Sequence, residues 1–299
     1  MRAVRYDRWA GIDGLEVVER PDPVASAGVA VVRVLSAGIN PATLSALRGA
    51  GYVPGRDLAG EVVAVGDEVR GVAVGDPVLG RVQDWWAHAE LVSVPAEQLL
   101  RKPGRLSWDV AGSLYTPAMA GLASVKAVVP RTGGLVIVSG ASGGVGLTAA
   151  QLARRCGASV IGLASADKAS WLTAHGITAV TYGNGEKERI LSAADGRQVD
   201  AFIDAAGSGY VALALDLGVA ADRINTVVDF AAARESGART MGTQDAGGMA
   251  AFEELAGLAA SGALDFPIAA TYPLADVREA YLAVAQRRLF GRIVLHPQS

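Results

Sequence analysis

Two hydrophobic patterns divide the chain. In the first hundred residues, short apolar runs occur at 29–35, 61–65 and 72–79. Turn-forming pairs such as Gly75-Asp76 separate these runs. Short strands with turn signals at regular intervals are typical of a compact β-barrel or sandwich. We therefore expect the first part of the chain to form a small β-domain.

From residue 135 onwards, apolar strands alternate with amphipathic helices. The pattern predicts strands at 135–139, 158–163, 178–181, 199–204 and 223–228, and helices at 144–156, 167–175, 185–194 and 209–217. Alternation of this kind indicates βαβ units around a parallel sheet that helices cover on both faces. The second part of the chain is therefore expected to be an α/β domain.

Helical patterns flank this α/β region. Ser107 is a candidate N-cap for a helical stretch that continues to Val129, and Pro117 is expected to interrupt it. A helix is predicted at about 248–261. The tail is predicted to form a helix at 274–287 and a strand at 291–295.

The segment 135–146 carries the strongest chemical signal. An apolar strand runs into Ser-Gly-Ala-Ser-Gly-Gly-Val-Gly, and a helical pattern follows. A diphosphate needs backbone N–H groups that point at it, a helix N-terminus behind it and no Cβ in the way. The spacing departs from G-x-G-x-x-G but keeps Gly143-x-x-Gly146. In this strand-turn-helix context the turn predicts a dinucleotide site, and a purely structural turn is the alternative.

The end of the second strand bears on the choice between NADPH and NADH. An NADH site usually places Asp or Glu there to hold the ribose 2′-hydroxyl. Here the strand ends in Ala164-Ser165 without a carboxylate, and Lys168 follows. A hydroxyl and an ammonium group suit a 2′-phosphate, which favours NADPH. Asp167 keeps NADH open, although it could instead cap the next helix.

Composition narrows the class of protein. The chain has 299 residues, of which 51% are hydrophobic and 19% charged, and its net charge is −3. These values indicate a globular protein of one large or two ordinary domains, without the basic surface that binds nucleic acid. No apolar run reaches the roughly 18 residues that span a membrane, and the N-terminus lacks the apolar core of a signal peptide. We therefore expect no membrane partner and a cytoplasmic location.

Metal and disulfide chemistry find little support in the residue counts. The single cysteine, Cys156, excludes an internal disulfide and a multi-cysteine zinc lobe. The three histidines, His88, His175 and His296, are scattered without ligand spacing. The sequence therefore predicts no metal site.

Short stretches along nearly the whole chain match one known pattern. They are Ala37–Pro41, Pro54–Gly60, Val65-Gly66, Val74–Val78, Ser139–Gly146, Gln151–Ala153, Gly157-Ala158, Lys168 and Gly291–Leu295. Together these stretches resemble the zinc-independent medium-chain dehydrogenases/reductases, the quinone oxidoreductase or zeta-crystallin-like family. Zinc alcohol dehydrogenases have Gly-His-Glu where this chain has Gly55-Arg56-Asp57.

The resemblance implies an α/β fold of two domains. A GroES-like β-barrel catalytic domain would comprise residues 1–107 and 264–299, and a Rossmann domain with a doubly wound parallel sheet would comprise 108–263. It also implies a homodimer and NADPH as cofactor. The residues implied to bind NADPH are Asn40, Ser142, Gly143, Gly144, Val145, Ser165, Lys168, Tyr182 and Arg292.

Two residues are candidates for catalysis. Tyr52 lies in a loop that resembles the tyrosine-bearing pattern of polyketide-type enoyl reductases, and it could donate a proton to the reduced acceptor. It could equally pack a turn against Pro54. Asn40 could hydrogen-bond the carbonyl of the acceptor or the nicotinamide ribose, and its alternative is a turn residue before Pro41.

Without zinc to polarise a carbonyl or alcohol, hydride addition to an activated C=C bond or a quinone is the favoured reaction. The first hypothesis is therefore an NADPH-dependent quinone or α,β-unsaturated carbonyl reductase. An enoyl reductase of a polyketide or other secondary-metabolite pathway is a specialised form of it. A non-catalytic NADPH-binding sensor or structural protein is the alternative from a different class.

Overall fold

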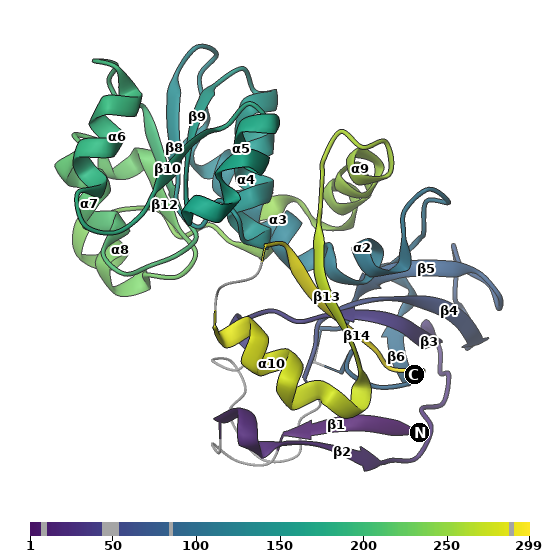
Figure 1. Cartoon of the computed structure of the whole chain (residues 1–299). Helices are drawn as coiled ribbons and strands as arrows, with labels where there is room; N and C mark the ends of the chain where they lie inside the picture. The colour runs from purple at the N-terminus through teal and green to yellow at the C-terminus, as the bar shows by residue number, and fades with distance from the viewer. Residues whose placement is uncertain (7–10, 44–53, 84–85, 287–289) are drawn as a thin grey trace. The chain divides into compact units, whose positions relative to one another are not determined.

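The structure is a computed structural model, and it describes residues 1–6, 11–43, 54–83, 86–286 and 290–299 (Figure 1). The chain forms two compact units. Unit 1 comprises Met1–Thr116 and Phe252–Ser299, and unit 2 comprises Pro117–Ala251. The boundaries between the compact units lie at 116/117 and 251/252. The domain boundaries expected at 107/108 and 263/264 stay a prediction.

Unit 1 is built around a seven-stranded sheet in the order β13-β14-β3-β4-β5-β7, in which β6 also pairs with β3. The strands are β3 (Val29–Gly38), β4 (Asp57–Val65), β5 (Pro77–Arg81), β6 (Leu91–Pro95), β7 (Leu99–Arg101), β13 (Ile268–Pro273) and β14 (Arg292–His296). All pairs are antiparallel except β13 with β14. A separate hairpin joins β1 (Arg2–Tyr6) to β2 (Leu15–Glu19).

The longest strand, β3, organises this sheet. Its first half pairs with β6 and its end pairs with β14, while β4 occupies its other edge. Register shifts between Val31 and Val32 and between Val34 and Ser36 bend the β3–β4 ladder, as β-bulges do at the corners of barrels. Apolar side chains of these strands form one buried cluster that includes Val32, Leu58 and Val78.

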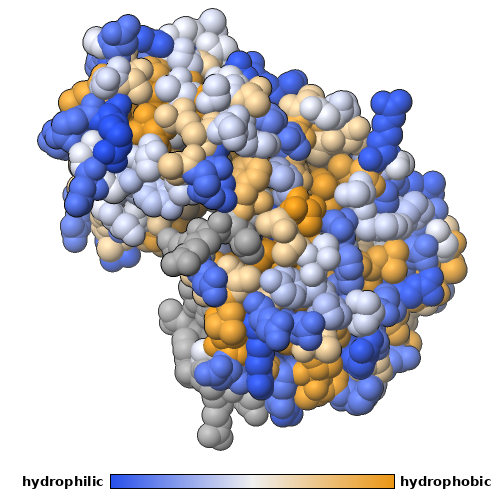
Figure 2. Space-filling model, in the orientation of Figure 1, coloured by the Kyte–Doolittle hydropathy of each residue, from blue (hydrophilic) through white to orange (hydrophobic). Residues whose placement is uncertain are grey.

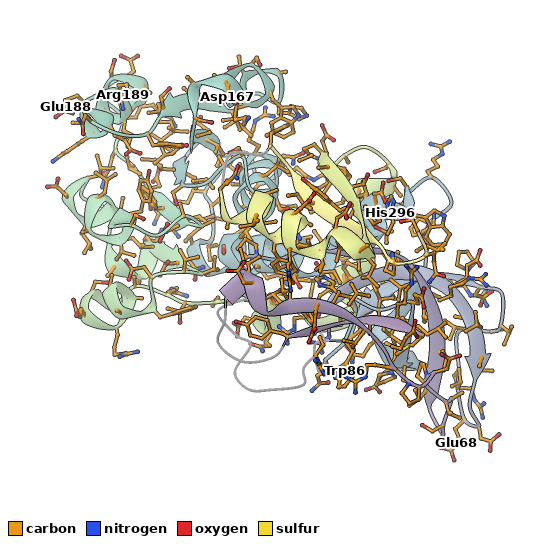
Figure 3. All side chains as sticks on the ribbon, turned by 60° about the horizontal axis from the view of Figure 1, so that its bottom comes forward. Glu68, Trp86, Asp167, Glu188, Arg189 and His296 are labelled. Carbon is orange, nitrogen blue, oxygen red and sulfur yellow. The ribbon has the colours of Figure 1, made fainter. Side chains whose placement is uncertain are left out.

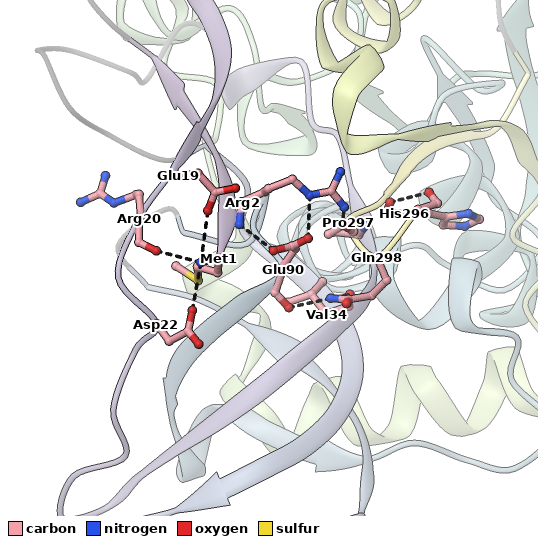
Figure 4. Close-up of polar contacts among 11 residues, drawn as sticks. Met1, Arg2, Glu19, Arg20, Asp22, Val34, Glu90, His296, Pro297 and Gln298 are labelled. Atoms are coloured by element: carbon pink, nitrogen blue, oxygen red, sulfur yellow. Dashed lines mark hydrogen bonds and ion pairs between the residues drawn. The ribbon is translucent and has the colours of Figure 1, made fainter.

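A second apolar cluster of unit 1 lies under α10 (Val277–Ala285), where Tyr281 and Leu295 are fully buried. Residues from both ends of the chain meet in this unit (Figure 4). Arg2 Nε donates to Glu90 Oε1 at 2.7 Å, and Arg2 Nη2 donates to the carbonyl oxygen of Pro297 at 3.3 Å. Gln298 Nε2 donates to the carbonyl oxygen of Glu90 at 2.8 Å. Unit 1 is therefore discontinuous in sequence.

Unit 2 contains a five-stranded parallel sheet in the order β10-β9-β8-β11-β12. Its strands are β8 (Leu135–Val138), β9 (Ser159–Ala164), β10 (Thr178–Thr181), β11 (Ala201–Asp204) and β12 (Ile224–Thr226). The strand order reverses between β8 and β11, which is the topological switch point of a doubly wound sheet. Figure 1 shows α4 (Gly144–Arg155) on one face and α6 (Glu186–Ala194) and α7 (Tyr210–Asp216) on the other.

The α/β prediction is confirmed element by element, since all five predicted strands of this region form the sheet. Unit 2 also contains α5 (Ala169–Ala174), α8 (Phe230–Ser236) and most of α3 (Tyr115–Val128). The helical stretch is interrupted at Leu114 rather than at Pro117, since α2 (Trp108–Ser113) ends there and Pro117 lies in the first turn of α3, where its missing N–H costs no intrahelical hydrogen bond. Ser107 caps α2 as expected, and its hydroxyl accepts from the backbone N–H of Val110 at 3.2 Å.

The strand predictions for unit 1 need correction, since β1, β2, β6, β7 and β13 lie outside the runs predicted from the sequence. The run 72–79 is a strand only from Pro77, because Gly75 (φ +90°) turns the chain and Asp76 accepts a hydrogen bond from the backbone N–H of Ala73. Strand β13 was not predicted, because its residues are half-buried or exposed and lack an alternating pattern. The predicted helix at 248–261 is α9 (Gly248–Ala260).

The visible surface mixes hydrophilic and hydrophobic side chains over both units (Figure 2). Among the described residues, no helix is both long enough and apolar enough to cross a membrane.

Candidate functional site

The glycine turn lies at the carboxyl end of β8. The turn starts with Gly140 in the left-handed region (φ +60°), and the backbone N–H of Gly143 closes it by donating to the carbonyl oxygen of Gly140 at 2.9 Å. Helix α4 packs directly on this turn. A Cβ at Gly146 would lie 2.3 Å from the carbonyl oxygen of Gly140, so only glycine permits this approach.

The N-terminus of α4 is available for an anion. Its cap residue, Gly143, is exposed and provides no side-chain cap, and Ser142, Gly144 and Val145 are half-buried. The first N–H groups of a helix have no partner within the helix and carry a partial positive charge. Because this helix starts beside the switch point of the sheet, these groups could bind the diphosphate of a dinucleotide.

A buried carboxylate that the sequence analysis missed braces this turn. Asp204 Oδ1 accepts from Ser139 Oγ at 2.7 Å and from the backbone N–H groups of Ala206 and Gly207 at 3.0 and 2.9 Å. Asp204 Oδ2 accepts from Thr226 Oγ1 at 2.7 Å. Asp204 thus joins the ends of β8, β11 and β12. The signal in the sequence was an Asp at the end of an apolar strand, directly before Ala-Ala-Gly.

Three of the predicted cofactor residues lie at the neighbouring strand ends. Ser165 and Lys168 follow β9, and Tyr182 follows β10. The backbone N–H of Tyr182 donates to the carbonyl oxygen of Ala164 at 3.4 Å, so the two strand ends are adjacent. The Tyr182 side chain is half exposed. Since β8, β9 and β10 are parallel neighbours, all three lie at the same edge of unit 2 as the glycine turn.

An arginine holds the turn that carries Tyr182. Arg189 on α6 donates to three backbone carbonyl oxygens of this turn, with Nη2 to Thr181 at 2.7 Å, Nη2 to Gly183 at 3.2 Å and Nη1 to Asn184 at 2.7 Å. These bonds fix the backbone on both sides of Tyr182. The turn is therefore held by hydrogen bonds from within the chain.

The hydroxyl of Ser165 and the ammonium group of Lys168 share one partner. Ser165 Oγ donates to Asp167 Oδ1, and Lys168 Nζ donates to Asp167 Oδ2. The hydrogen bonds from Lys168 and Ser165 lower the pKa of Asp167. The predicted capping role of Asp167 is not observed, because the carboxylate contacts these side chains and the caps of the next helical turns carry no side-chain bond.

In unit 1, four polar residues form a buried cluster where strand ends meet. The end of β3 lies beside the starts of β4 and β14, which brings Asn40, Asp57 and Arg292 together. Asn40 Nδ2 donates to Asp57 Oδ2 at 3.1 Å, and Arg292 Nη2 donates to Asn40 Oδ1 at 2.7 Å. Asp57 Oδ1 accepts from the backbone N–H of Thr116 at 3.1 Å and from its hydroxyl.

Burial and neighbouring groups have opposite effects on the pKa of Asp57 in this cluster. Burial raises the pKa of Asp57, while the Arg292 guanidinium and the donors of Thr116 and Asn40 act to lower it. Asn40 and Arg292 are almost inaccessible, at 5% and 6% exposure. The Asn40 amide uses its nitrogen to donate to Asp57 and its oxygen to accept from Arg292. It therefore connects these two residues. The cofactor roles of Asn40 and Arg292 stay predictions.

Tyr52, the candidate proton donor, lies outside the described residues. His88, a buried histidine of unit 1, has a structural environment. His88 Nε2 lies 3.3 Å from the carbonyl oxygen of Gly38, and Nδ1 lies 3.3 Å from the hydroxyl of Tyr281. Burial lowers the pKa of His88 to about 4. A Cβ at Gly55 would lie 2.3 Å from the His88 ring, so glycine (φ +102°) is required there.

No metal centre is evident in the part of the chain that the structure describes, since no group of three or more His, Cys, Asp or Glu residues could hold an ion there. Arg56 and Asp57 occupy the places where zinc alcohol dehydrogenases carry His and Glu.

Two family models match the chain. The model described as an alcohol dehydrogenase GroES-like domain matches residues 26–132, and the one described as a zinc-binding dehydrogenase matches residues 175–295. The first match extends past the expected boundary at 107/108, and the second runs from within the expected Rossmann domain into the C-terminal part of the expected catalytic domain.

Curated relatives are similar over different lengths. A quinone oxidoreductase of Lama guanicoe is 29% identical over 56% of this chain, and the chain spans about half of that relative, namely 54%. A quinone oxidoreductase of Pseudomonas aeruginosa is 27% identical over 97% of this chain and 98% of its own length. A phenolphthiocerol synthesis polyketide synthase of Mycobacterium marinum is 33% identical over 64% of this chain, which covers 9% of that synthase.

Solved structures share the whole fold. The quinone oxidoreductase from Coxiella burnetii superposes with a TM-score of 0.87 at 23% identity and covers 99% of both chains. At this identity the likeness shows the fold, and the family models and curated relatives add the sequence relationship. The two dehydrogenase family models and the quinone oxidoreductase relatives together support the quinone oxidoreductase family of the medium-chain dehydrogenases/reductases for this chain.

Proposed function

We propose that this protein is an NADPH-dependent reductase that transfers hydride to a quinone or to the activated C=C bond of an α,β-unsaturated carbonyl compound. One observation carries the proposal. The glycine turn lies beside the switch point of a parallel sheet, and Ser165, Lys168 and Tyr182 follow the next two strands at the same edge. That edge is where doubly wound sheets bind dinucleotides.

The residues of this edge fit the parts of NADPH. The N–H groups at the start of α4 would bind the diphosphate, while the Ser165 hydroxyl and the Lys168 ammonium would bind the 2′-phosphate. When bound, the nicotinamide supplies a hydride to an electrophilic carbon. Unit 1 would bind the acceptor, and Tyr52 is proposed to donate the proton to the reduced product.

We also propose that the reaction needs no zinc. In unit 1, the Asp57 carboxylate is occupied by Asn40 and Thr116, and both ring nitrogens of His88 have neighbours in hydrogen-bonding range. A Lewis acid is the usual means of activating a simple alcohol or carbonyl. Acceptors that are already electrophilic at carbon need less help, which favours quinones and enones.

A second candidate is an enoyl reductase of a polyketide or other secondary-metabolite pathway. It is supported by the 33% identity to the Mycobacterium marinum polyketide synthase. A homodimer in the cytoplasm, with no nucleic-acid or membrane partner, remains part of the proposal.

The test is NADPH consumption with a panel of quinones, enals, cyclic enones and short enoyl thioesters. We expect turnover with at least one acceptor class, and with an enal, enone or enoyl thioester as acceptor, NADPH deuterated at the transferred position should deliver deuterium to a carbon of the product. Preference for the enoyl thioester would favour the second candidate. Tight NADPH binding without turnover on any acceptor would contradict the reductase and favour a non-catalytic NADPH-binding protein.

A further inference from the structure

We propose that Asp167 sets the cofactor preference of this protein, because its carboxylate occupies the position that a 2′-phosphate would take. The inference rests on the proposed nucleotide site. It concerns the ratio of the affinities for NADPH and NADH. Asp167 would change this ratio without itself binding the phosphate.

The geometry is local. Two donors converge on one carboxylate, since Ser165 Oγ binds Asp167 Oδ1 and Lys168 Nζ binds Asp167 Oδ2. The Lys168 side chain is only 15% exposed, whereas the Asp167 side chain is 64% exposed. Figure 3 shows Asp167 at the outer edge of the molecule. The Ser165 hydroxyl and the Lys168 ammonium group therefore already point at one position. The Asp167 carboxylate is the anion that they bind there.

The charge of this anion acts in opposite directions on the two cofactors. A 2′-phosphate carries nearly two negative charges at pH 7 and needs the same two donors. To bind them it must displace Asp167, and the displaced carboxylate then remains close to the phosphate. The 2′-hydroxyl of NADH is a donor, so the carboxylate can accept its hydrogen bond directly.

The expected size of the effect is modest. Asp167 is exposed, and water and salt weaken interactions between exposed charges. A unit carboxylate within a few ångströms of a doubly charged phosphate in such a place corresponds to roughly a tenfold change in Kd. We therefore expect the preference of the unaltered protein for NADPH over NADH to be about tenfold smaller than it would be without the charge of Asp167.

The experiment compares Asp167→Asn with the unaltered protein. Asp216→Asn is the matched control, because Asp216 is 62% exposed and also pairs with a lysine, Lys187. Equilibrium Kd values are measured for NADPH, NADH, 2′,5′-ADP and AMP. Asp167→Asn should raise the NADPH preference, as the ratio of the two Kd values, by about tenfold. The same shift should appear for 2′,5′-ADP over AMP, and it should shrink with added salt.

Asp216→Asn should leave both Kd ratios, NADPH to NADH and 2′,5′-ADP to AMP, within about twofold of those of the unaltered protein. This is expected for an exposed ion pair away from the ligand. Asp167→Ser should reproduce the shift, which separates loss of the charge from any property of asparagine. Equal changes for NADPH and NADH, or no change, would overturn the role of Asp167 and leave the proposed function intact. If the unaltered protein binds neither nucleotide, the proposed function fails as well.

Discussion

The buried cluster of Asn40, Asp57 and Arg292 makes a prediction about single residues. Asp57 is fully buried and Arg292 is 6% exposed, so each charge depends on the other for compensation. Asp57→Asn should destabilise unit 1 by about 3–5 kcal/mol, because it leaves a buried guanidinium without its counter-charge. Urea unfolding measured by tryptophan fluorescence provides the value.

A double-mutant cycle provides the control for Asp57→Asn. Replacing both charges, as in Asp57→Asn with Arg292→Met, should cost less than the sum of the two single changes, because no unpaired charge remains. Additive losses would mean that the two charges do not interact across the cluster.

Residue types could be predicted from the sequence, but their partners could not. Ser165 and Lys168 were expected to bind a phosphate from their place after β9, and they lie there. That both bind Asp167 depends on side-chain rotamers, which spacing along the chain does not specify. Asn40 and Arg292 are separated by 252 positions, so their hydrogen bond follows from the pairing of β3 with β14.

At the scale of elements, the contact between α4 and the glycine turn makes the next prediction. Gly146→Ala would place a Cβ 2.3 Å from the carbonyl oxygen of Gly140, so the helix must move away from the turn. Overpacking of this kind costs about 1–3 kcal/mol. We expect lower stability of unit 2 and at least tenfold weaker nucleotide binding, since the N–H groups of α4 move with the helix.

Gly257→Ala is the control for Gly146→Ala. Gly257 also lies within a helix, α9, and nothing lies within 4 Å of its ideal Cβ. Alanine there should be neutral or stabilising by up to about 1 kcal/mol, because it improves helix propensity. Thermal unfolding and nucleotide Kd are measured for both variants. Nucleotide binding that is unchanged in Gly146→Ala would show that close packing of α4 is not needed for the site.

The elements differ in how far hydrophobic patterns predict them. Strands β8 and β11 of unit 2 are short and fully buried, and β8 is continuously apolar while β11 is apolar up to Asp204. Their periodic alternation with helices made them predictable. Strand β13 carries no such pattern, because its residues are half-buried or exposed and its place is set by parallel pairing with β14.

At the scale of the whole molecule, unit 1 is assembled from the two ends of the chain. Arg2 contacts Pro297, and Gln298 donates to the carbonyl oxygen of Val34 at 3.1 Å. No periodicity in the sequence predicts such contacts. The family resemblance did imply them, because it implied a catalytic domain with a second domain inserted between its parts.

The stability of unit 1 should depend on pH through His88. Burial lowers the pKa of His88 to about 4, whereas a histidine in the unfolded chain titrates near 6.5. Because the unfolded state binds the proton more tightly, stability is complete above about pH 6.5 and is lost as pH falls towards 4. By pH 5 the loss should be roughly 2 kcal/mol relative to pH 7.5.

The measurement is urea unfolding between pH 7.5 and 5 in a Trp171→Phe background, where the remaining tryptophans all precede residue 117 and report on unit 1. His88→Gln should flatten the pH dependence by about the same 2 kcal/mol, because glutamine cannot titrate. His296→Gln, at a half-buried pair with Asp109, should leave the His88 contribution in place. An equal loss in the unaltered protein and His88→Gln would mean that the folded unit accommodates the protonated ring, and that the contacts of His88 with Gly38 and Tyr281 rearrange to allow it.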